Sequence, residues 1–507
     1  MKPAAVGLDV GSTHVKAAVV DVGGRVLAVA RAPTPLRPDG VGMMHPFDEL
    51  LGAAEAVVRE AVTAAAPVRI AGLGIASVAE SGLPVDAAGE PLDDVLAWFD
   101  PRPAPQARML AATVGAPELF VRTGLRPEPK VTLAKLAWLR DERPDVARRM
   151  AEWRFVADAV AGSWTGGSGT SATLACRSMA WDLRRRTWDE ELLALVGLRS
   201  EQMPPLVPWT SPVGAVRAAA AARLGVAAGL PVAVAGHDHV VGALAAGAVG
   251  RGDVVDSIGT AEALLLVTDV PALDEEVRLA GFSVGSHVLD GRSTLIGGLQ
   301  ASGAFIDWFL TALAGVAPDA DPDVRSTRLL ELVALAARRP SGIVAQATLR
   351  GRTAPLPDAS ATASFSGLTA ADGLPELALA ALEGTAFHAR WLVDELGRLA
   401  GVAPARIRVI GGGARNEPLL AVKAALTPAP LEVLDEPEAV AVGAGFVGLV
   451  AAGTAPSQLV TDRAPAVRVV TATRSERAAY ADAYAAFRRL VVMAAVSPSS
   501  GGPPPRR

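Results

Sequence analysis

The sequence contains the same kind of strand-to-strand turn twice, once near its start and once near its middle. The first copy reads GLDVGST at residues 7–13, and the second reads VDSIGT at residues 255–260. In both copies an apolar run carries an aspartate, and a glycine followed by a hydroxyl residue begins the turn. The spacing from aspartate to glycine differs by one residue between the copies. Such a recurrence is typical of an internal duplication and predicts two domains of related fold.

The length of the chain agrees with two large domains. One hydrophobic core stops growing at roughly 250 to 300 residues, and this chain has 507. Half of the residues are hydrophobic and only 20% are charged, which excludes global disorder. We expect a boundary near residue 247, with an N-terminal domain at 1–247 and a C-terminal domain at 248–496. The segment 497–507 is rich in Ser, Gly and Pro and is expected to be a disordered tail.

Strands and helices alternate through much of the chain, which indicates an α/β fold. A helix is expected at 47–66, and further helices are expected to begin next to Asp238 and at Asn416. The expected strands lie at 5–8, 14–20, 25–30, 69–75, 231–236, 254–260, 263–267 and 407–410.

Charge and hydropathy argue against several classes of partner. The 48 basic and 53 acidic residues give a net charge of −5, without the basic excess that nucleic-acid binding requires. The longest uncharged apolar runs, such as 439–453, are shorter than the roughly 18 residues of a membrane-spanning helix. No export signal is visible, and the single cysteine, Cys176, cannot form an internal disulfide and is expected to be buried. We therefore expect a cytoplasmic protein with no nucleic-acid or membrane partner.

The first turn has the chemistry of a phosphate-binding loop. Backbone N–H groups at Gly11, together with the hydroxyls of Ser12 and Thr13, can surround phosphate oxygens while Asp9 faces a metal ion. The alternative is an ordinary β-hairpin with polar turn residues. Lys16 either neutralises phosphate or edges the sheet.

The second turn offers Gly259 and Thr260 in the same relation. Two such turns that face each other would hold a polyphosphate between two domains. Glu262 is expected to be structural, because another carboxylate close to the phosphates would repel them unless it bound a metal ion.

Asp238 stands where a buried strand ends and a helix begins. Side chains at this position project into the crevice at the carboxyl edge of a sheet, where catalysis is common. The alternative role is helix capping, for which Asp is a favoured residue. His237 and His239 flank it, but two imidazoles with no further Cys or His nearby do not predict a zinc site.

A glycine-rich turn, GGGARN at 411–416, follows an apolar strand and precedes a helix. Bare backbone at Gly412 and Gly413 could approach a nucleotide there. Asn416 stands where the dinucleotide-binding pattern requires glycine, so this is not a dinucleotide fingerprint. Asn416 is either part of the nucleotide site or an ordinary helix cap.

Two segments in the first half suit a sugar. WFDPR at 98–102 combines the indole of Trp98, the carboxylate of Asp100 and the guanidinium of Arg102. Aromatic faces cover the C–H patches of sugars, and charged groups bond their hydroxyls. A surface salt bridge beside a core tryptophan is the alternative. Glu80 is a second candidate for a hydroxyl contact, against the alternative of a solvated loop residue.

The ordered set of motifs resembles the FGGY family of carbohydrate kinases, which belong to the actin-like ATPase superfamily. Besides the segments above, it includes TG at 123–124, KLAWL at 135–139 and SGAFIDW at 302–308, and it spans nearly the whole chain. The resemblance implies an α/β fold of two ribonuclease-H-like domains flanking a central cleft. Sugar would bind mainly to the first domain and ATP mainly to the second, and the family is compatible with a homodimer.

The resemblance also implies roles for single residues. Asp238 matches the catalytic base and, with Asp9, the carboxylates that face Mg2+. Thr13 and Thr260 match phosphate contacts. The nucleotide-binding segments of the family match Gly303, Gly412, Gly413 and Asn416.

The implied activity is transfer of the γ-phosphoryl group of ATP to a hydroxyl of a small carbohydrate, a ketopentose, ketohexose, aldonate or polyol. The sugar-contacting stretch of the family often reads Gly-Gln followed by His or by Arg-Glu, whereas SVAES stands here at 77–81. The sugar is therefore not identified. Two alternatives stay open, an actin-like regulatory ATPase and a sugar-binding pseudokinase without phosphotransfer.

Overall fold

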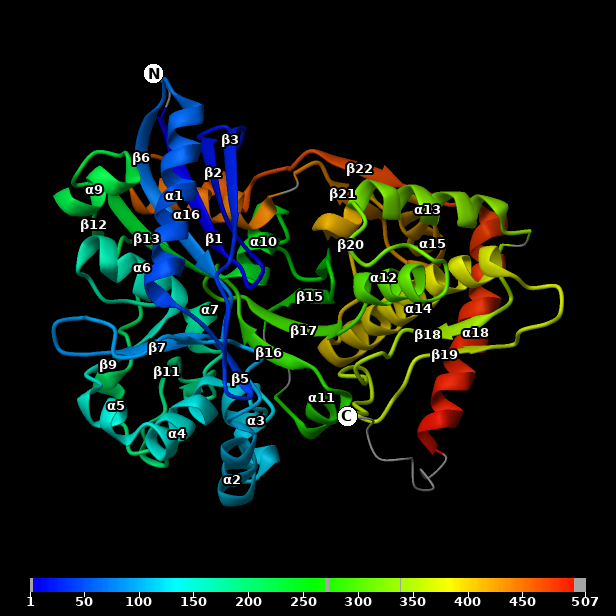
Figure 1. Cartoon of the computed structure of the whole chain (residues 1–507), viewed down its shortest axis with the longest axis horizontal. Helices are drawn as coiled ribbons and strands as arrows, with labels where there is room; N and C mark the ends of the chain where they lie inside the picture. Colours follow the sequence, from blue (N-terminus) through cyan, green and yellow to red (C-terminus); the bar gives the residue numbers. More distant parts are fainter. Residues whose placement is uncertain (1–2, 270–272, 338, 437, 497–507) are drawn as a thin grey trace.

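The computed structural model describes residues 3–269, 273–337, 339–436 and 438–496 and shows an α/β protein built around two large sheets (Figure 1). The predicted disordered tail, 497–507, lies outside the described residues.

The first sheet has six strands from the N-terminal half of the chain. They are β1 (Pro3–Val10), β2 (His14–Asp21), β3 (Val26–Pro33), β6 (Arg69–Ser77), β12 (Gly214–Ala215) and β13 (Pro231–His237). Their order is β12-β13-β6-β1-β2-β3. Strands β1, β2 and β3 form an antiparallel meander, and β6 and β13 extend the sheet parallel to β1.

The second sheet repeats this plan in the C-terminal half. Its strands are β14 (Asp253–Ile258), β15 (Glu262–Thr268), β16 (Ser283–Ser286), β17 (Ser293–Leu299), β20 (Arg406–Ile410), β21 (Leu431–Leu434) and β22 (Val467–Val470). Their order is β16-β17-β15-β14-β20-β21-β22. Strands β14, β15 and β17 pair antiparallel, and β20 and β21 follow parallel to β14. The predicted α/β class and the recurrence of one strand plan are confirmed.

A small sheet in the N-terminal half was not predicted. It consists of β4 (Arg37–Asp39), β5 (Gly42–His45), β7 (Gly82–Val85), β8 (Val95–Leu96) and β9 (Glu152–Phe155). Its strands are only two to four residues long, so they carry too little periodicity to be recognised. Two two-stranded ribbons complete the strands, β10 (Trp181–Asp182) with β11 (Thr187–Trp188) and β18 (Val344–Gln346) with β19 (Ser364–Ser366).

Helices surround the sheets and form much of the outer surface (Figure 1). In the first half they are α1 (Phe47–Ala65), α2 (Ala104–Val114), α3 (Ala116–Thr123), α4 (Thr132–Glu142), α5 (Pro144–Arg149), α6 (Val156–Thr165), α7 (Ala172–Ala175), α8 (Glu190–Ala194), α9 (Ala218–Leu224) and α10 (Asp238–Ala245). In the second half they are α11 (Glu275–Ala280), α12 (Gly303–Ala312), α13 (Pro322–Leu335), α14 (Leu374–Ala400), α15 (Glu417–Leu426), α16 (Ala439–Ala451), α17 (Gln458–Thr461) and α18 (Arg474–Val496).

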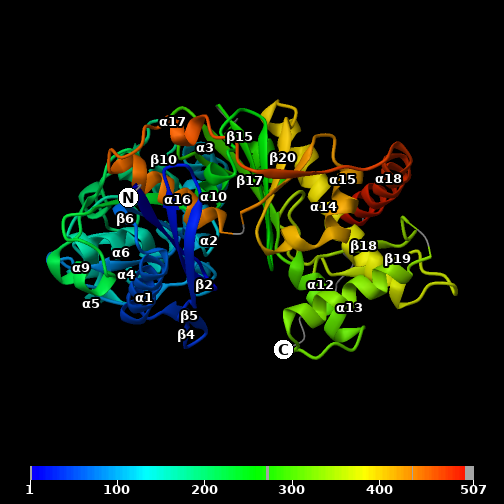
Figure 2. The same ribbon diagram turned by 90° about the horizontal axis from the view of Figure 1, so that it is seen from above.

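Helix α16 crosses from the second half of the chain to cover the first sheet. It packs against β1, β6 and β13, and it also lies beside α10 (Figure 2). The helix is apolar on all sides, which is typical of a helix without a solvent-facing side. Glycines make the approach close, since a Cβ built on Gly7 would lie 1.8 Å from the carbonyl oxygen of Ala441, and one on Gly74 would lie 1.8 Å from that of Ala444.

The two sheets therefore share a buried layer. Apolar side chains of α10 and α16 form one cluster with residues of β1, β2, β14 and β15. Separate clusters fill the rest of each half. Cys176 is buried, as predicted. Within the described ranges, no helix combines the length and apolar character needed to cross a membrane.

Candidate active site

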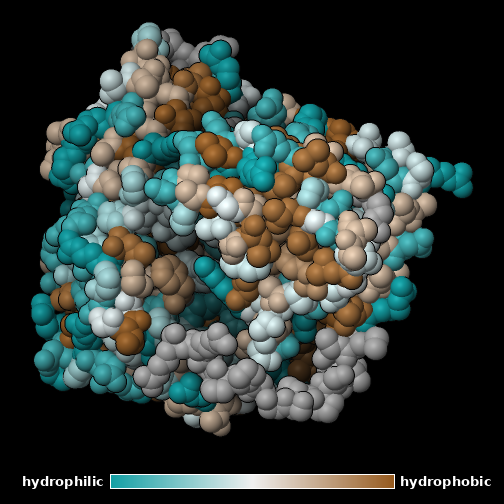
Figure 3. All heavy atoms as spheres, turned by 45° about the vertical axis from the view of Figure 1, so that its right-hand side comes forward, coloured by the Kyte–Doolittle hydropathy of each residue, from teal (hydrophilic) through white to brown (hydrophobic). Residues whose placement is uncertain are grey.

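The carboxyl ends of three parallel strands meet at one edge of the first sheet. Asp9 near the end of β1 and Gly236 of β13 both pair with Ala76 of β6, and His237 pairs with Ser77. The residues at or just after these ends therefore lie together, and ligands of such sheets bind at this edge. The face in Figure 3 is hollowed near its middle.

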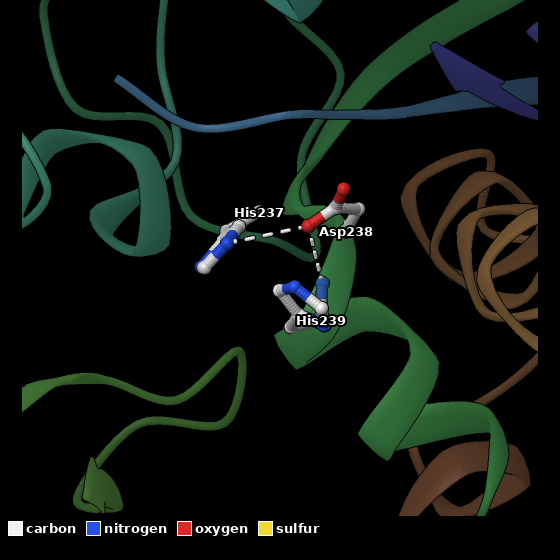
Figure 4. Close-up of side chains that lie close together, drawn as sticks. All are labelled: His237, Asp238 and His239. Atoms are coloured by element: carbon white, nitrogen blue, oxygen red, sulfur yellow. Dashed lines mark hydrogen bonds and ion pairs between the residues drawn. The ribbon is translucent and has the colours of Figure 1, made fainter. Parts of the chain in front are cut away.

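Asp238 lies at the junction between β13 and α10 (Figure 4). Its Oδ1 accepts a hydrogen bond from the backbone N–H of His239 at 2.6 Å and lies 3.2 Å from Nε2 of His237. No hydrogen bond is recorded for Oδ2 within the described residues, and the side chain is 21% exposed. One oxygen is thus held by its neighbours, and the carboxylate stays accessible.

His237 supports this carboxylate as a neutral ring. Burial, the largest cause, lowers the pKa of His237 to about 3. The neutral ring can carry its proton on Nε2, which faces Asp238. His237, Asp238 and His239 place possible metal-ligand atoms within 4.8 Å of one another. The expectation that they do not form a zinc site stays a prediction.

Asp9 is a buried carboxylate near the end of the first strand. Its Oδ1 has no hydrogen-bond partner among the residues that the structure describes. The pKa of Asp9 is raised to about 8, mainly by burial and also by the nearby charge of Asp238, whereas Lys16 opposes the rise. Lys16 itself forms an ion pair with Glu438 at 2.8 Å. Carboxylate oxygens are ligands that Mg2+ prefers, so Asp9 and Asp238 fit such an ion.

The first turn is a compact hairpin with an exposed tip. The N–H of Gly11 donates to the carbonyl of His14 at 3.1 Å, and Thr34 Oγ1 donates to the carbonyl of Gly11 at 2.7 Å. Thr13 is exposed and Ser12 half-buried. The hairpin thus uses the Gly11 donor internally and leaves the two hydroxyl residues for a ligand.

The second turn lies against the start of α12. The N–H of Gly303 donates to the carbonyl of Gly259 at 3.1 Å, and the N–H of Ala304 donates to that of Thr260 at 3.0 Å. A Cβ on Gly303 would lie 2.5 Å from the Gly259 oxygen, so only glycine allows this approach. Two segments that are far apart in sequence are thereby joined at one edge of the second sheet.

The glycine-rich turn reaches the same edge. Gly411 has φ 88°, a left-handed conformation that favours glycine, and a Cβ on Gly413 would lie 2.2 Å from a methyl carbon of Ile258. Gly412 faces open space. Asn416 Oδ1 accepts from the N–H of Leu419 at 3.2 Å and so caps α15. A cavity of about 570 Å³ adjoins this turn and extends to the ends of β21 and β22.

Glu80, a candidate for contact with the sugar, is held in a strained backbone conformation. Its φ is 62°, which non-glycine residues rarely adopt and which occurs at functional sites. Arg177 donates to Glu80 Oε1 from Nε at 2.9 Å and from Nη2 at 2.5 Å. Burial raises the pKa of Glu80, but Arg177 and nearby lysines outweigh it and hold that pKa below its usual value. The predicted alternative of a solvated loop residue does not describe Glu80, which is buried.

Arg177 was not predicted, because a single arginine after Cys176 carries no recognisable motif. Its Nη1 is buried without a hydrogen-bond partner in the described part of the chain. Lys135 lay in a segment of the family resemblance but was given no role. Its Nζ donates to the backbone carbonyl of Glu80 at 2.8 Å.

Lys135 gives a prediction on stability. Burial lowers its pKa from 10.5 to about 7. Between these pH values the unfolded chain binds a proton at Lys135 that the folded protein does not bind, so stability from this residue increases with pH. The difference in free energy of unfolding between wild type and Lys135→Met should therefore rise by up to ~1.4 kcal/mol per pH unit above pH 7. Urea denaturation at pH 7, 8 and 9 measures it, and a difference that falls with pH contradicts the assignment.

The residues of the WFDPR segment differ in how accessible they are to a ligand. Trp98 is 37% exposed and contacts Phe99 edge-on at 5.5 Å. Asp100 is buried and accepts from Arg102, which also donates to Asp39 at 2.6 Å. The guanidinium of Arg102 further lies 4.5 Å from the centre of the Trp138 ring. The structure thus leaves the indole accessible, while Asp100 and Arg102 are bound to each other and to the protein.

Residues 4–245 match the N-terminal domain of the FGGY family of carbohydrate kinases, and residues 254–452 match the C-terminal domain of that family. The chain belongs to the FGGY family of carbohydrate kinases. This FGGY kinase is 30% identical over 464 residues to a glycerol kinase from Alkalilimnicola ehrlichii, covering 89% of this chain and 90% of that protein. It is 27% identical over 454 residues to an L-fuculokinase from Escherichia coli O157:H7, covering 87% and 91%.

A solved structure has the same fold. A xylulose kinase from Rhodospirillum rubrum superposes with a TM-score of 0.86 at 27% identity, over 97% of this chain and 98% of the other. The actin-like fold predicted for this FGGY kinase is thereby confirmed. The protein is a carbohydrate kinase, a phosphotransferase that uses ATP and has an alcohol group as acceptor.

Proposed function

We propose that this FGGY kinase transfers the γ-phosphoryl group of ATP to a hydroxyl of a small carbohydrate, with Asp238 as the general base. The similar proteins are named glycerol kinase, L-fuculokinase and xylulose kinase, and a gluconokinase from Bacillus subtilis is also similar to this chain. This range supports a polyol, ketopentose, ketohexose or aldonate as acceptor.

One observation carries the proposal. Asp238 is a partly exposed carboxylate at the sheet edge, with one oxygen held by its neighbours, and its charge helps to raise the pKa of the buried Asp9. Oδ1 of Asp9 has no hydrogen-bond partner among the described residues. Two carboxylates placed together in this way suit a metal-bound triphosphate and a proton acceptor.

Asp238 accepts the proton of the acceptor hydroxyl as its oxygen bonds to the γ-phosphorus of ATP. The bond from that phosphorus to the bridging oxygen breaks, and ADP leaves with the electron pair. Positioning and charge neutralisation supply most of the catalysis in such reactions.

The chain offers groups for each part of ATP. Ser12 and Thr13 in the first turn and Thr260 in the second supply hydroxyls for phosphate oxygens, and Gly11 and Gly259 let the backbone come close. Asp9 and Asp238 would hold Mg2+, which would neutralise phosphate charge when bound. The segments proposed to contact the rest of the nucleotide are Gly303, Gly412, Gly413 and Asn416. Lys16, which forms an ion pair with Glu438, would neutralise phosphate charge.

For the sugar we propose direct contacts from Glu80 and from the accessible face of Trp98. Asp100 and Arg102 then support the loop that carries Trp98, because their charged groups bind each other. A carboxylate and an indole together suit the hydroxyl and C–H surfaces of a small carbohydrate.

Acceptor-dependent release of ADP tests the proposal. Purified protein with ATP and Mg2+ is screened against polyols, ketopentoses, ketohexoses and aldonates, and the product is identified by mass spectrometry. We expect a phosphorylated product from one class and little ADP release without acceptor. ADP release that no acceptor stimulates would favour the regulatory ATPase, and tight sugar binding without any turnover would favour the pseudokinase.

A further inference from the structure

A buried ionic network lies beneath the edge of the second sheet. Lys423 of α15 places its Nζ 2.5 Å from Asp256 Oδ2 of β14 and 2.6 Å from Glu262 Oε1 of β15. Glu262 Oε2 also accepts a hydrogen bond from Ser302 Oγ at 2.6 Å. All four side chains are buried. We call Lys423, Asp256, Glu262 and Ser302 the Lys423 network.

The four members of the Lys423 network adjoin three segments of the proposed nucleotide site. Asp256 and Glu262 stand on either side of the turn with Gly259 and Thr260. Ser302 immediately precedes Gly303, at the start of α12. Lys423 is on α15, the helix that begins directly after the glycine-rich turn. The Lys423 ammonium thus links the helix after the glycine-rich turn to the two strands of the second turn, and Glu262 links these to Ser302.

Stability alone does not account for this arrangement. Desolvation makes a buried ion pair about as costly as it is favourable, and well-packed apolar residues would often serve as well. Here two carboxylates share one lysine, and burial together with the charge of Glu262 raises the pKa of Asp256. Directional contacts of this kind fix the relative placement of the elements that carry them.

We propose that Glu262 and Lys423 are positioning residues that hold the three nucleotide-binding segments in register for ATP. The inference rests on the proposed function for the identity of those segments. Neither side chain reaches the ligand itself, since both are buried beneath the turn. They would act through the neighbouring Gly259, Thr260 and Gly303, because Glu262 accepts from Ser302 and Lys423 pairs with the strands on both sides of the turn. The sequence predicted that Glu262 is structural, and its structural role would be to position the nucleotide-binding segments.

Glu262→Gln tests the proposal, because it keeps the volume and the acceptor for Ser302 but removes the charge that faces Lys423. Displacements of about 1 Å in a binding site can cost up to ~10²-fold, so we expect the KM for ATP and the Kd for ADP to rise by ~10-fold or more. The KM for the acceptor should change less than ~2-fold, because the sugar side lies on the other domain. Ser302→Ala, which removes one hydrogen bond, should shift the same constants in the same direction by less.

Glu383→Gln is the matched control. Glu383 is also a buried carboxylate of the second half, and it accepts from Ser341 Oγ at 2.6 Å and from Tyr480 Oη at 3.0 Å. The Glu383→Gln substitution should lower the melting temperature without changing the KM for ATP or the Kd for ADP. If Glu262→Gln and Ser302→Ala lower only the melting temperature, like the control, the Lys423 network is merely structural and the inference is wrong. That result would leave the kinase proposal intact, which fails instead if no acceptor is phosphorylated by the wild type.

Discussion

Replacing Asp238 by Asn is expected to lower kcat by about 10²- to 10⁴-fold, the usual contribution of a general base. Asparagine has nearly the same shape, so it can still accept from the His239 N–H, but it cannot take the proton of the attacking hydroxyl. The affinity for ADP should change little, because the proposed base contacts the acceptor rather than the nucleoside. Steady-state kinetics with the acceptor from the screen, and calorimetric titration with ADP, measure the two quantities.

Asp274→Asn is the control for this substitution. Asp274 also begins a helix, and its Oδ1 accepts from the Val277 N–H at 3.1 Å, but it lies outside the proposed site. Asn caps helices as well as Asp does, so kcat should stay near the wild-type value. If Asp238→Asn keeps the full kcat, Asp238 is not the general base and its carboxylate serves only at the start of the helix.

Gly74→Ala is expected to be strongly destabilising although it adds only one methyl group. Its Cβ would lie 1.8 Å from the carbonyl oxygen of Ala444, a backbone atom that cannot rotate away. Helix α16 would have to move off the first sheet, and overpacking of this kind typically costs ~1–3 kcal/mol and occasionally more. We expect a loss at the upper end of that range and a melting temperature lower by roughly 3–6 °C, as measured by calorimetry.

Gly52→Ala provides the comparison. Gly52 is exposed in the interior of α1, and a Cβ there meets nothing within 4 Å. The change should stabilise the protein by about 0.5–1 kcal/mol, because alanine is the better helix former. If Gly74→Ala melts at the same temperature as Gly52→Ala, then α16 does not pack against β6 as closely as described.

The strands at the centre of the two sheets could be predicted from the sequence because they rest on local signals, whereas β12, β16, β17, β21 and β22 were not predicted. The two turns near Gly11 and Gly259 end apolar runs, and each lies at the first hairpin of its sheet. The partner of α16 could not be predicted. An apolar run at 439–453 indicates a buried helix, but periodicity says nothing about which sheet covers it.

The candidate site divides in the same way. Asp238 follows a strand and could be placed at a sheet edge from sequence alone. The partner of Glu80, Arg177, comes from a loop distant in the chain, and such pairs depend on the tertiary fold. Lys16 was open to two interpretations, and its ion pair with Glu438 joins β2 to a residue that no local pattern connects with it. The ion pair of Asp100 with Arg102 was foreseen only as an alternative.

The route of α16 also bears on how the protein is made. During translation the N-terminal half leaves the ribosome well before residues 439–451 are made. The face of its sheet that α16 covers in the folded protein is therefore exposed during that time. Exposed apolar surface on a nascent chain invites aggregation and chaperone binding. The core of the first half is consequently complete only after α16 has been made. A fragment that ends near residue 247 would lack the helix that covers one face of its sheet.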